Sequence, residues 1–259
     1  MYNQLNIVLY TLFSLILEDF DLAPKQKKYR HEIKLLLSYP DYLVMSKRLK
    51  ALLEPDEYAG DDGEYFIRSL YLDDVSHTAY WEKLAGAADR KKYRIRVYNC
   101  SDSIIKLECK EKRGSRICKR SATISRECFE SIKNGDFSPL AQYDNDLCHE
   151  VLAVAKAKGL SPSVVVDYDR EAYVHPVSNV RLTFDKALHA GVESADIFDD
   201  KMMTLPIYPD ESVIFEVKYD SVLPKFLADI VSNTHGSKLA LSKFCLCRDV
   251  LKAFKPTYR

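Results

Sequence analysis

Charged and apolar residues alternate along several short segments of the sequence. Between Tyr93 and Val97, arginines occupy the even positions and apolar residues occupy the odd ones. Glu216 and Lys218 alternate in the same way with valine, phenylalanine and tyrosine. Successive side chains of a β-strand point to opposite faces of the sheet. The pattern therefore predicts strands that carry their charges on one face and their apolar residues on the other.

The distribution of such segments along the chain predicts an α+β fold. Runs rich in Val, Ile, Tyr and Phe alternate with amphipathic helical stretches, and the turn at 110–114 joins two of the runs into a hairpin. We therefore expect an eight-stranded antiparallel β-barrel with helices packed outside it. The predicted strands are 29–37, 66–72, 92–99, 104–112, 116–124, 163–174, 179–185 and 212–219. The predicted helices are 41–53, 75–86, 126–133, 144–158, 221–232 and 242–254, with Asp41 and Ser125 as N-caps of two of them.

Two parts of the chain differ in composition. Residues 1–24 contain an apolar segment, Leu5 to Leu17, for which we expect a helix packed on the domain or, alternatively, a surface or membrane contact. Residues 25–259 contain no Pro- or Gly-rich linker and are predicted to form a single domain. No run of apolar residues is long enough for a membrane-spanning helix. The cysteines show no CxxC spacing, which favours free thiols in a reducing compartment over a zinc site or disulfides.

For any one strand, a charged face that points to solvent is the simpler interpretation. Two observations favour the interior of a barrel when the strands are taken together. The predicted helices have apolar stripes, which need an apolar outer sheet face to pack on. The charged faces also hold ten basic and four acidic residues, in a chain with 38 residues of each sign. The basic residues are Arg30, Lys34, Arg94, Arg96, Lys106, Lys110, Lys112, Arg170, Arg181 and Lys218, and the acidic ones are Glu32, Glu108, Asp185 and Glu216.

A surplus of positive charge inside a barrel requires a counter-charge, because leaving one partner of a buried ion pair alone costs about 3–5 kcal/mol. Guanidinium groups bind phosphate oxygens in pairs, and lysines act as point charges. A linear ligand with repeated phosphates therefore fits such an interior, and the few carboxylates are expected to hold a divalent cation that bridges phosphate oxygens. A chain without net charge is not expected to bind nucleic acid through its overall charge.

The sequence also resembles a known family. In order along residues 28–247, the matching segments are YRHEIK (29–34), SLYLDD (69–74), KYRIRVY (92–98), KLECKEKRG (106–114), DYDREAY (167–173), VRLTFD (180–185), IFEVKYD (214–220) and LSKF (241–244). They resemble the triphosphate tunnel metalloenzymes, a CYTH-like superfamily, and within it the catalytic domain of the vacuolar transporter chaperone (VTC) polyphosphate polymerases. The resemblance implies a tunnel that transfers the γ-phosphate of ATP to a growing inorganic polyphosphate chain. It also implies release of ADP and dependence on Mn²⁺ or Mg²⁺.

The same resemblance implies site residues. The implied phosphate-binding residues are Lys34, Arg94, Arg96, Lys110, Lys112, Arg170, Arg181, Lys218 and Lys243. Within that set, the implied catalytic residues are Arg94, Arg96, Lys110, Lys218 and Lys243. The implied metal ligand is Glu216, and Glu108 either assists it or only orients neighbouring basic residues.

One position departs from the pattern of the tunnel hydrolases. Those enzymes open with ExExK, whereas this chain has Arg30, Glu32 and Lys34 at the corresponding positions. The missing carboxylate favours chain transfer over hydrolysis by metal-activated water. A tunnel-type inorganic triphosphatase or nucleoside triphosphatase is the first alternative, and a non-catalytic polyphosphate-binding module is the second. A third is a barrel with a polar outer face and no ligand.

The expected partners are ATP and inorganic polyphosphate, without nucleic acid. The free thiols and the lack of a spanning helix predict a cytoplasmic location, with peripheral attachment to the inner face of the membrane as the alternative. The sequence leaves open a membrane or transporter partner and the oligomeric state.

Overall fold

The computed structural model describes residues 30–114, 116–192, 195–208, 210–238 and 242–254. The predicted apolar helix within residues 1–24 lies outside these ranges. Within them, none of the helices combines the length and the apolar character that crossing a bilayer requires. All the cysteines are free thiols, as predicted.

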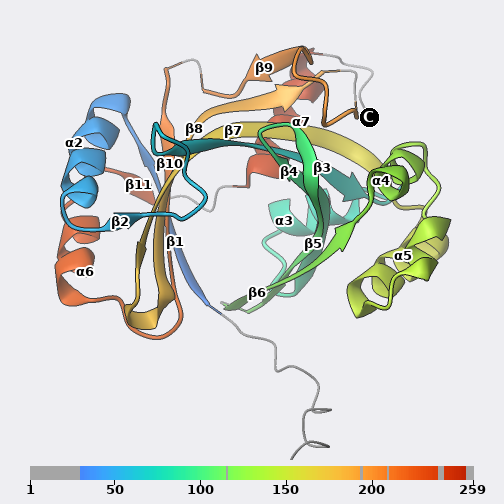
Figure 1. Cartoon of the computed structure of the whole chain (residues 1–259), viewed down its shortest axis with the longest axis horizontal. Coiled ribbons are helices and arrows are strands. Elements are labelled where there is room, and N and C mark those ends of the chain that lie inside the picture. The colour runs from blue at the N-terminus through green and yellow to red at the C-terminus, as the bar shows by residue number, and fades with distance from the viewer. Residues whose placement is uncertain (1–29, 115, 193–194, 209, 239–241, 255–259) are drawn as a thin grey trace, which may run out of the picture.

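The strands of the described residues form one sheet (Figure 1). Eight long strands run in the order β1-β10-β8-β7-β3-β4-β5-β6, all antiparallel to their neighbours, and each coincides with a predicted strand. The short strands β11, β2 and β9 pair with β1, β7 and β8. The strands are β1 (His31–Leu37), β2 (Glu54–Pro55), β3 (Glu64–Asp73), β4 (Arg90–Tyr98), β5 (Ser101–Arg113), β6 (Arg116–Ile124), β7 (Ser161–His175), β8 (Val180–Gly191), β9 (Thr204–Pro206), β10 (Val213–Tyr219) and β11 (Ser237–Lys238).

The expected closure into a barrel is wrong for the described residues. The outermost long strands, β1 and β6, meet at a single bridge, in which the Arg30 amide donates to the Ile117 carbonyl at 3.1 Å. β6 begins at Arg116, one residue from this bridge, so an antiparallel partner for most of β1 is missing on that side. The short strand β11 pairs instead with Leu35 and Leu36. The sheet is therefore curved and open, with one concave and one convex face.

The α-helices of the described residues coincide with the six predicted ones. Ser125 is the N-cap of α4, as predicted, and its hydroxyl accepts the amide of Cys128 at 3.2 Å. α2 begins earlier than predicted because its N-cap is Ser38, whose hydroxyl accepts the amide of Asp41 at 3.2 Å. The helices are α2 (Tyr39–Lys50), α3 (Thr78–Leu84), α4 (Arg126–Lys133), α5 (Asp146–Lys158), α6 (Lys225–Ser232) and α7 (Lys243–Phe254), with 3₁₀ turns η2 (Ser138–Gln142) and η3 (Val177–Asn179).

Four helices cover the convex face, at the two sides of the molecule (Figure 1). α4 contacts β7, α5 contacts β5 and β6, and Phe129 of α4 is fully buried in one apolar cluster with Leu107 of β5. α2 and α6 pack on β1, β8 and β10 in a second cluster, where Phe184 stacks on Phe215 with ring centroids 4.8 Å apart. These contacts confirm the predicted helices outside the sheet.

α7 lies on the concave face, so the prediction that every helix packs outside is wrong. Its Phe244 stacks on Tyr71 of β3 at 5.1 Å, and both belong to a third buried cluster that includes Tyr168 of β7. Amphipathic periodicity places an apolar stripe on a helix but does not say which face of a sheet the stripe will meet. The position of α7 brings its first residue, Lys243, among the charged side chains of the strands.

A buried ion pair fixes α7 to the end of β3. Arg248 of α7 donates to Asp73 at 3.0 Å, and each side chain is only 3% exposed. Asp73 also accepts the amides of Ala79 and Tyr80 at 3.0 and 3.3 Å, at the beginning of α3. The Arg248 guanidinium lies over the Tyr80 ring, 4.6 Å from its centroid. One carboxylate thus holds β3, α3 and α7 together.

Replacing Arg248 with methionine leaves the Asp73 charge buried without its cation. We expect Arg248→Met to lower the free energy of unfolding by about 3–5 kcal/mol, measured by urea denaturation of the full chain. The exposed Arg48 of α2 provides the control, since Arg48→Met is expected to change it by less than about 0.5 kcal/mol. Equal unfolding midpoints for the two variants would contradict this role of the ion pair.

Candidate functional site

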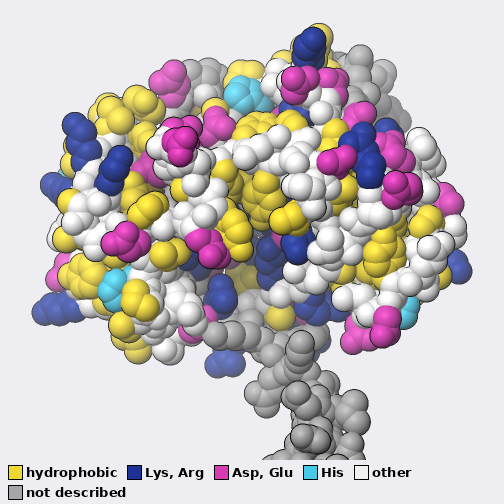
Figure 2. All heavy atoms as spheres, viewed as in Figure 1, with side chains coloured by type: hydrophobic (Ala, Val, Ile, Leu, Met, Phe, Trp, Pro, Cys, Tyr) yellow, Lys and Arg dark blue, Asp and Glu magenta, His cyan; other side chains and the backbone are white. Residues whose placement is uncertain are grey.

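Alternation along the strands places charged side chains on the concave face. On β4, Arg94 and Arg96 point to this face, whereas Tyr93 and Ile95 belong to the apolar cluster under α4 and α5. In the space-filling view, Lys and Arg side chains lie within the hollow between the β1 and β6 sides of the molecule (Figure 2). The structure therefore brings together charges from strands that are far apart in the sequence.

Glu108 of β5 gathers three cations. Its Oε2 accepts Nε of Arg94 at 2.7 Å and lies 3.8 Å from Nε of Arg96, and its Oε1 lies 2.5 Å from Nζ of Lys119 on β6. Arg94 also donates to the hydroxyl of Tyr71 at 2.9 Å. Burial alone would raise the pKa of Glu108, but Arg94, Arg96 and Lys119 outweigh it and hold that pKa far below its ordinary value. Glu108 is therefore a permanent anion.

Tyr168 of β7 continues the contacts toward β8. Its hydroxyl accepts hydrogen bonds from Arg96 at 3.1 Å and from Arg170 at 3.5 Å. Arg170 forms a bidentate ion pair with Asp185 of β8, with N–O distances of 2.6 and 2.8 Å. Burial would raise the pKa of Asp185, but Arg170 and Lys243 lower it to about 2. Asp185 thus stays ionised although it is completely buried.

Glu216 of β10 lies among three lysines. Its Oε1 is 2.8 Å from Nζ of Lys34 and 3.3 Å from Nζ of Lys243, and its Oε2 accepts from Lys218. Lys243 is also 2.5 Å from Asp185, so it connects the two carboxylates. Burial would raise the pKa of Glu216, but Lys218, Lys243 and Lys34 hold it well below its ordinary value.

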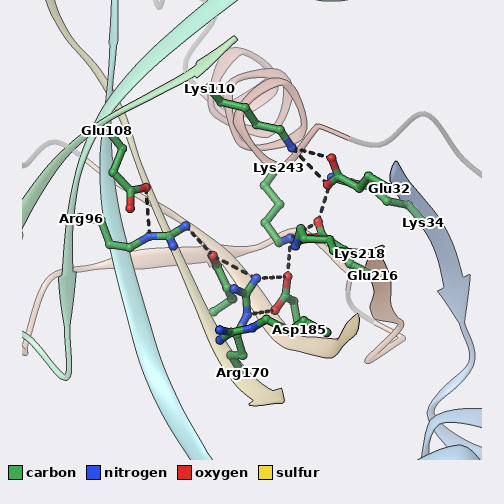
Figure 3. Close-up of polar contacts among 12 residues, drawn as sticks. Glu32, Lys34, Arg96, Glu108, Lys110, Arg170, Asp185, Glu216, Lys218 and Lys243 are labelled. Atoms are coloured by element: carbon green, nitrogen blue, oxygen red, sulfur yellow. Dashed lines mark hydrogen bonds and ion pairs between the residues drawn. The ribbon is translucent and has the colours of Figure 1, made fainter. Parts of the chain in front are cut away.

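Glu32 of β1 and Lys110 of β5 end the series of contacts that begins at Glu108 (Figure 3). Glu32 lies 3.2 Å from Lys34 and 2.8 Å from Lys110. The two ends of the series, Glu108 and Lys110, both lie on β5. We call this set the polar ring. Its members are Glu32, Lys34, Arg94, Arg96, Glu108, Lys110, Lys119, Tyr168, Arg170, Asp185, Glu216, Lys218 and Lys243.

The polar ring carries a surplus of positive charge. It holds eight basic residues and four carboxylates, and each carboxylate is shared by two or three cations. A single carboxylate that contacts two or three cations neutralises only part of their positive charge. The ring therefore attracts an anion of high charge that can reach several of its members at once.

Two of the predicted phosphate-binding residues lie outside the polar ring. Arg181 of β8 donates to the hydroxyl of Tyr65 at 2.6 Å and lies 2.7 Å from Asp56, next to β2. Lys112, at the end of β5, forms no ion pair with any residue that the structure describes. The other predicted residues, including Glu216 and Glu108, all belong to the ring.

Sequence reasoning missed two members of the polar ring. Lys119 lies directly opposite Lys110 in the β5–β6 hairpin, so hairpin register and alternation contain its signal. Tyr168 precedes Arg170 by two residues on one strand, and the same alternation places it on the charged face. Alternation places Glu32 and Asp185 on the charged faces, and the structure shows each of them between two cations.

The carboxylates do not form a metal site by themselves. No group of three or more His, Cys, Asp or Glu residues that could hold a metal ion occurs in the described part of the chain. Mg²⁺ is commonly bound through one or two carboxylates together with substrate phosphates. Glu216, which shares Lys34 with Glu32, fits that arrangement. Glu108 contacts three cations, as Glu216 does, so it fits the same arrangement.

A comparison with protein families decides where the chain belongs. The model of the VTC domain matches residues 29–252, a range that contains every member of the polar ring. The chain belongs to the VTC domain family. The resemblance drawn from the sequence segments is therefore confirmed.

Solved structures with low sequence identity share this VTC chain's fold. One is a putative adenylyl cyclase from Hippeastrum, described as revealing a dominant triphosphatase activity, with 14% identity and a TM-score of 0.54 over 86% of this chain and 96% of that chain. Another is a putative adenylate cyclase from Bacillus halodurans, with 12% identity and a TM-score of 0.52 over 83% of this chain and 95% of that chain. No curated protein sequence matches the chain.

Proposed function

We propose that this VTC domain is a polyphosphate polymerase that transfers the γ-phosphate of ATP to a growing inorganic polyphosphate chain and releases ADP. The observation that carries the proposal is the polar ring, in which eight basic residues from six strands and α7 lie on the concave face with only four carboxylates. A single compact phosphate reaches only part of such a ring. A linear chain of phosphates reaches cations all around it.

Phosphoryl transfer depends mainly on alignment and on neutralising the charge of the transferred group. In the proposed reaction, a terminal oxygen of the polyphosphate chain forms a bond to the γ-phosphorus of ATP as the bond from that phosphorus to the bridging oxygen of ADP breaks. The attacking oxygen is already anionic at neutral pH, so no general base is needed. This agrees with the polar ring, which contains no histidine; His31 stacks on Tyr219 at 5.0 Å, on the opposite face of β1 from Glu32.

The ring residues have complementary parts in this reaction. Arg94 and Arg96 present planar guanidinium groups, which bind two phosphate oxygens at once. Lys218 and Lys243 come from different elements and meet at Glu216, where they offset charge on the transferred group. The remaining phosphates are proposed to bind to Lys34, Lys110, Arg170 and Arg181. Lys112, near the end of β5, is a further proposed phosphate-binding residue.

Mn²⁺ or Mg²⁺ is proposed to enter with the phosphate chain. Glu216 is the carboxylate that would hold the ion, together with oxygens of the substrate phosphates. The ion supplies charge neutralisation for the phosphates when it is bound. ATP and inorganic polyphosphate are the only partners that this proposal requires.

A triphosphatase is the second candidate, because the Hippeastrum protein that shares the fold is described as having that activity. Hydrolysis requires a water molecule activated by a metal held on protein carboxylates. Arg30 stands where the hydrolase pattern has a carboxylate, and it pairs with Asp220 at 3.1 Å. This difference favours transfer to a phosphate chain over transfer to water.

One experiment separates these functions. Purified protein is incubated with ATP and Mn²⁺, and the products are separated on a gel that resolves phosphate chains. Long chains together with ADP support the polymerase, free phosphate without chains supports the triphosphatase, and binding of polyphosphate without ADP supports a non-catalytic module. Neither binding nor turnover would overturn the proposal altogether.

The same gel tests the arginine and lysine assignments. We expect Arg94→Ala and Lys110→Ala to abolish chain synthesis, because each removes a cation that faces the axis, while thermal unfolding stays cooperative. Arg48→Ala, on the exposed side of α2, is the matched control and is expected to synthesise chains normally. Chain synthesis retained by both ring variants would remove Arg94 and Lys110 from the site.

Glu216→Gln tests the proposed metal ligand. The substitution keeps the shape of the side chain but removes the charge that three lysines share, so we expect tripolyphosphate binding to persist. Chain synthesis is expected to fall at least about tenfold or to require more Mn²⁺, since a lost charged ligand costs about 1.4 kcal/mol or more. Glu57→Gln, at an exposed position, is the control. An unchanged Mn²⁺ titration would exclude Glu216 as a ligand.

A further inference from the structure

Lys92 of β4 extends the row of Arg96 and Arg94 toward α7. It precedes Arg94 by two residues and so shares the concave face, about 6.7 Å farther along the strand. Its direct neighbour on β5 is Lys110. Lys92 thus adjoins the polar ring, but none of the ring's ion pairs includes it.

The ammonium group of Lys92 lacks the counter-charge that the ring cations have. It donates to the hydroxyl of Ser242 at 2.7 Å and lies 5.1 Å from the centroid of the Phe244 ring. Within the described residues it forms no ion pair with a carboxylate. The titratable groups that act on it are Lys110 of β5, Arg90 of β4, Lys83 of α3 and the Cys245 thiol of α7, and three of these are cations.

This environment disfavours the charged form of the side chain. Burial lowers the pKa of Lys92 to about 7, and the charges of Lys110, Arg90 and Lys83 act in the same direction. An anion placed beside the amine reverses that effect, because opposite charges favour the protonated state. In the function proposed above, the anion that binds to the polar ring is a phosphate chain.

We propose that Lys92 is a further phosphate-binding residue, which holds a phosphoryl group on the α7 side of the polar ring and takes up a proton from solvent as it does so. The proposal rests on the proposed function, because it requires a phosphate chain that occupies the ring. It extends the chain path beyond Arg94 and makes chain binding depend on pH near neutrality.

The sign of this dependence follows from the two states of Lys92. At pH 8 the free side chain is mostly neutral, whereas a bound phosphoryl group raises its pKa toward the ordinary value for lysine. Binding therefore takes up a proton, and affinity falls as pH rises above about 7, by up to about tenfold per pH unit from this residue. Below about pH 6, Lys92 is charged in both states and contributes no uptake.

Calorimetric titration with inorganic tripolyphosphate tests the proposal. Titrations at pH 8 in two buffers of different ionisation enthalpy give the number of protons taken up on binding. We expect Lys92→Met to take up fewer protons than the wild type, by as much as one, and to bind about tenfold more weakly at pH 6.5. Burial also lowers the pKa values of Lys110 and Lys119 to about 8, so the difference between variants is the measured quantity.

Two further variants make the outcome decisive. Lys92→Arg keeps the charge without the titration, so we expect it to bind as tightly as the wild type at pH 6.5 and up to about tenfold more tightly at pH 8, with the proton uptake of Lys92 removed. Lys91→Met is the matched control, because Lys91 points to the convex face and pairs with Glu150 at 3.0 Å. Unchanged uptake and affinity in Lys92→Met would overturn the role of Lys92 alone. Failure of the wild type to bind tripolyphosphate would overturn the proposed function as well.

Discussion

Sharing of a few carboxylates among many cations is the interaction on which the concave face depends. Basic side chains that face each other within a curved sheet repel, which destabilises the pairing of their strands unless anions lie between them. Glu108 and Glu216 each contact three cations, and Glu32 and Asp185 each contact two. Because burial would otherwise protonate these acids, the cations also keep the acids charged. Each set of charges is stable only in the presence of the other.

The same sharing prepares the face for an anionic ligand. A carboxylate that contacts three lysines neutralises none of them fully. The remaining positive charge would attract a phosphate group without breaking all of the ion pairs. The lysines that meet at Glu216 come from β1, β10 and α7, and their spacing is set by the backbone and not by the ligand. The ring is thus organised without a ligand, which would lower the cost of ordering side chains on binding.

Much of this architecture is present in local sequence patterns, and the remainder depends on packing between distant elements. Period-two alternation is a property of each strand, so eight strands and the face of Arg94 or Lys218 are predictable from short windows. The open seam between β1 and β6 depends on where β6 begins relative to Arg30, which no single window contains. The place of α7 depends on the buried pair of Arg248 with Asp73, separated by 175 residues.

The site shows the same division between local and distant information. Alternation assigns a residue to a face but not to a height along the axis, because neighbouring strands of a curved sheet are staggered. Lys110 therefore reaches Glu32 across the concave face, whereas Arg181, on an equally clear pattern, pairs with Asp56 outside the ring. Tyr168 carries no charge, so a search for charged alternation passes over it although it joins two arginines.

The balance of charge also bears on the choice between transfer and hydrolysis. A hydrolytic metal must be held firmly enough to lower the pKa of a bound water, which requires carboxylates free to coordinate it. Here each ring carboxylate already serves two or three cations, and Arg30 replaces the acid that the hydrolase pattern places before Glu32. In the proposed transfer, an anionic chain end would need no such activation, and carboxylates that orient the cations would be sufficient.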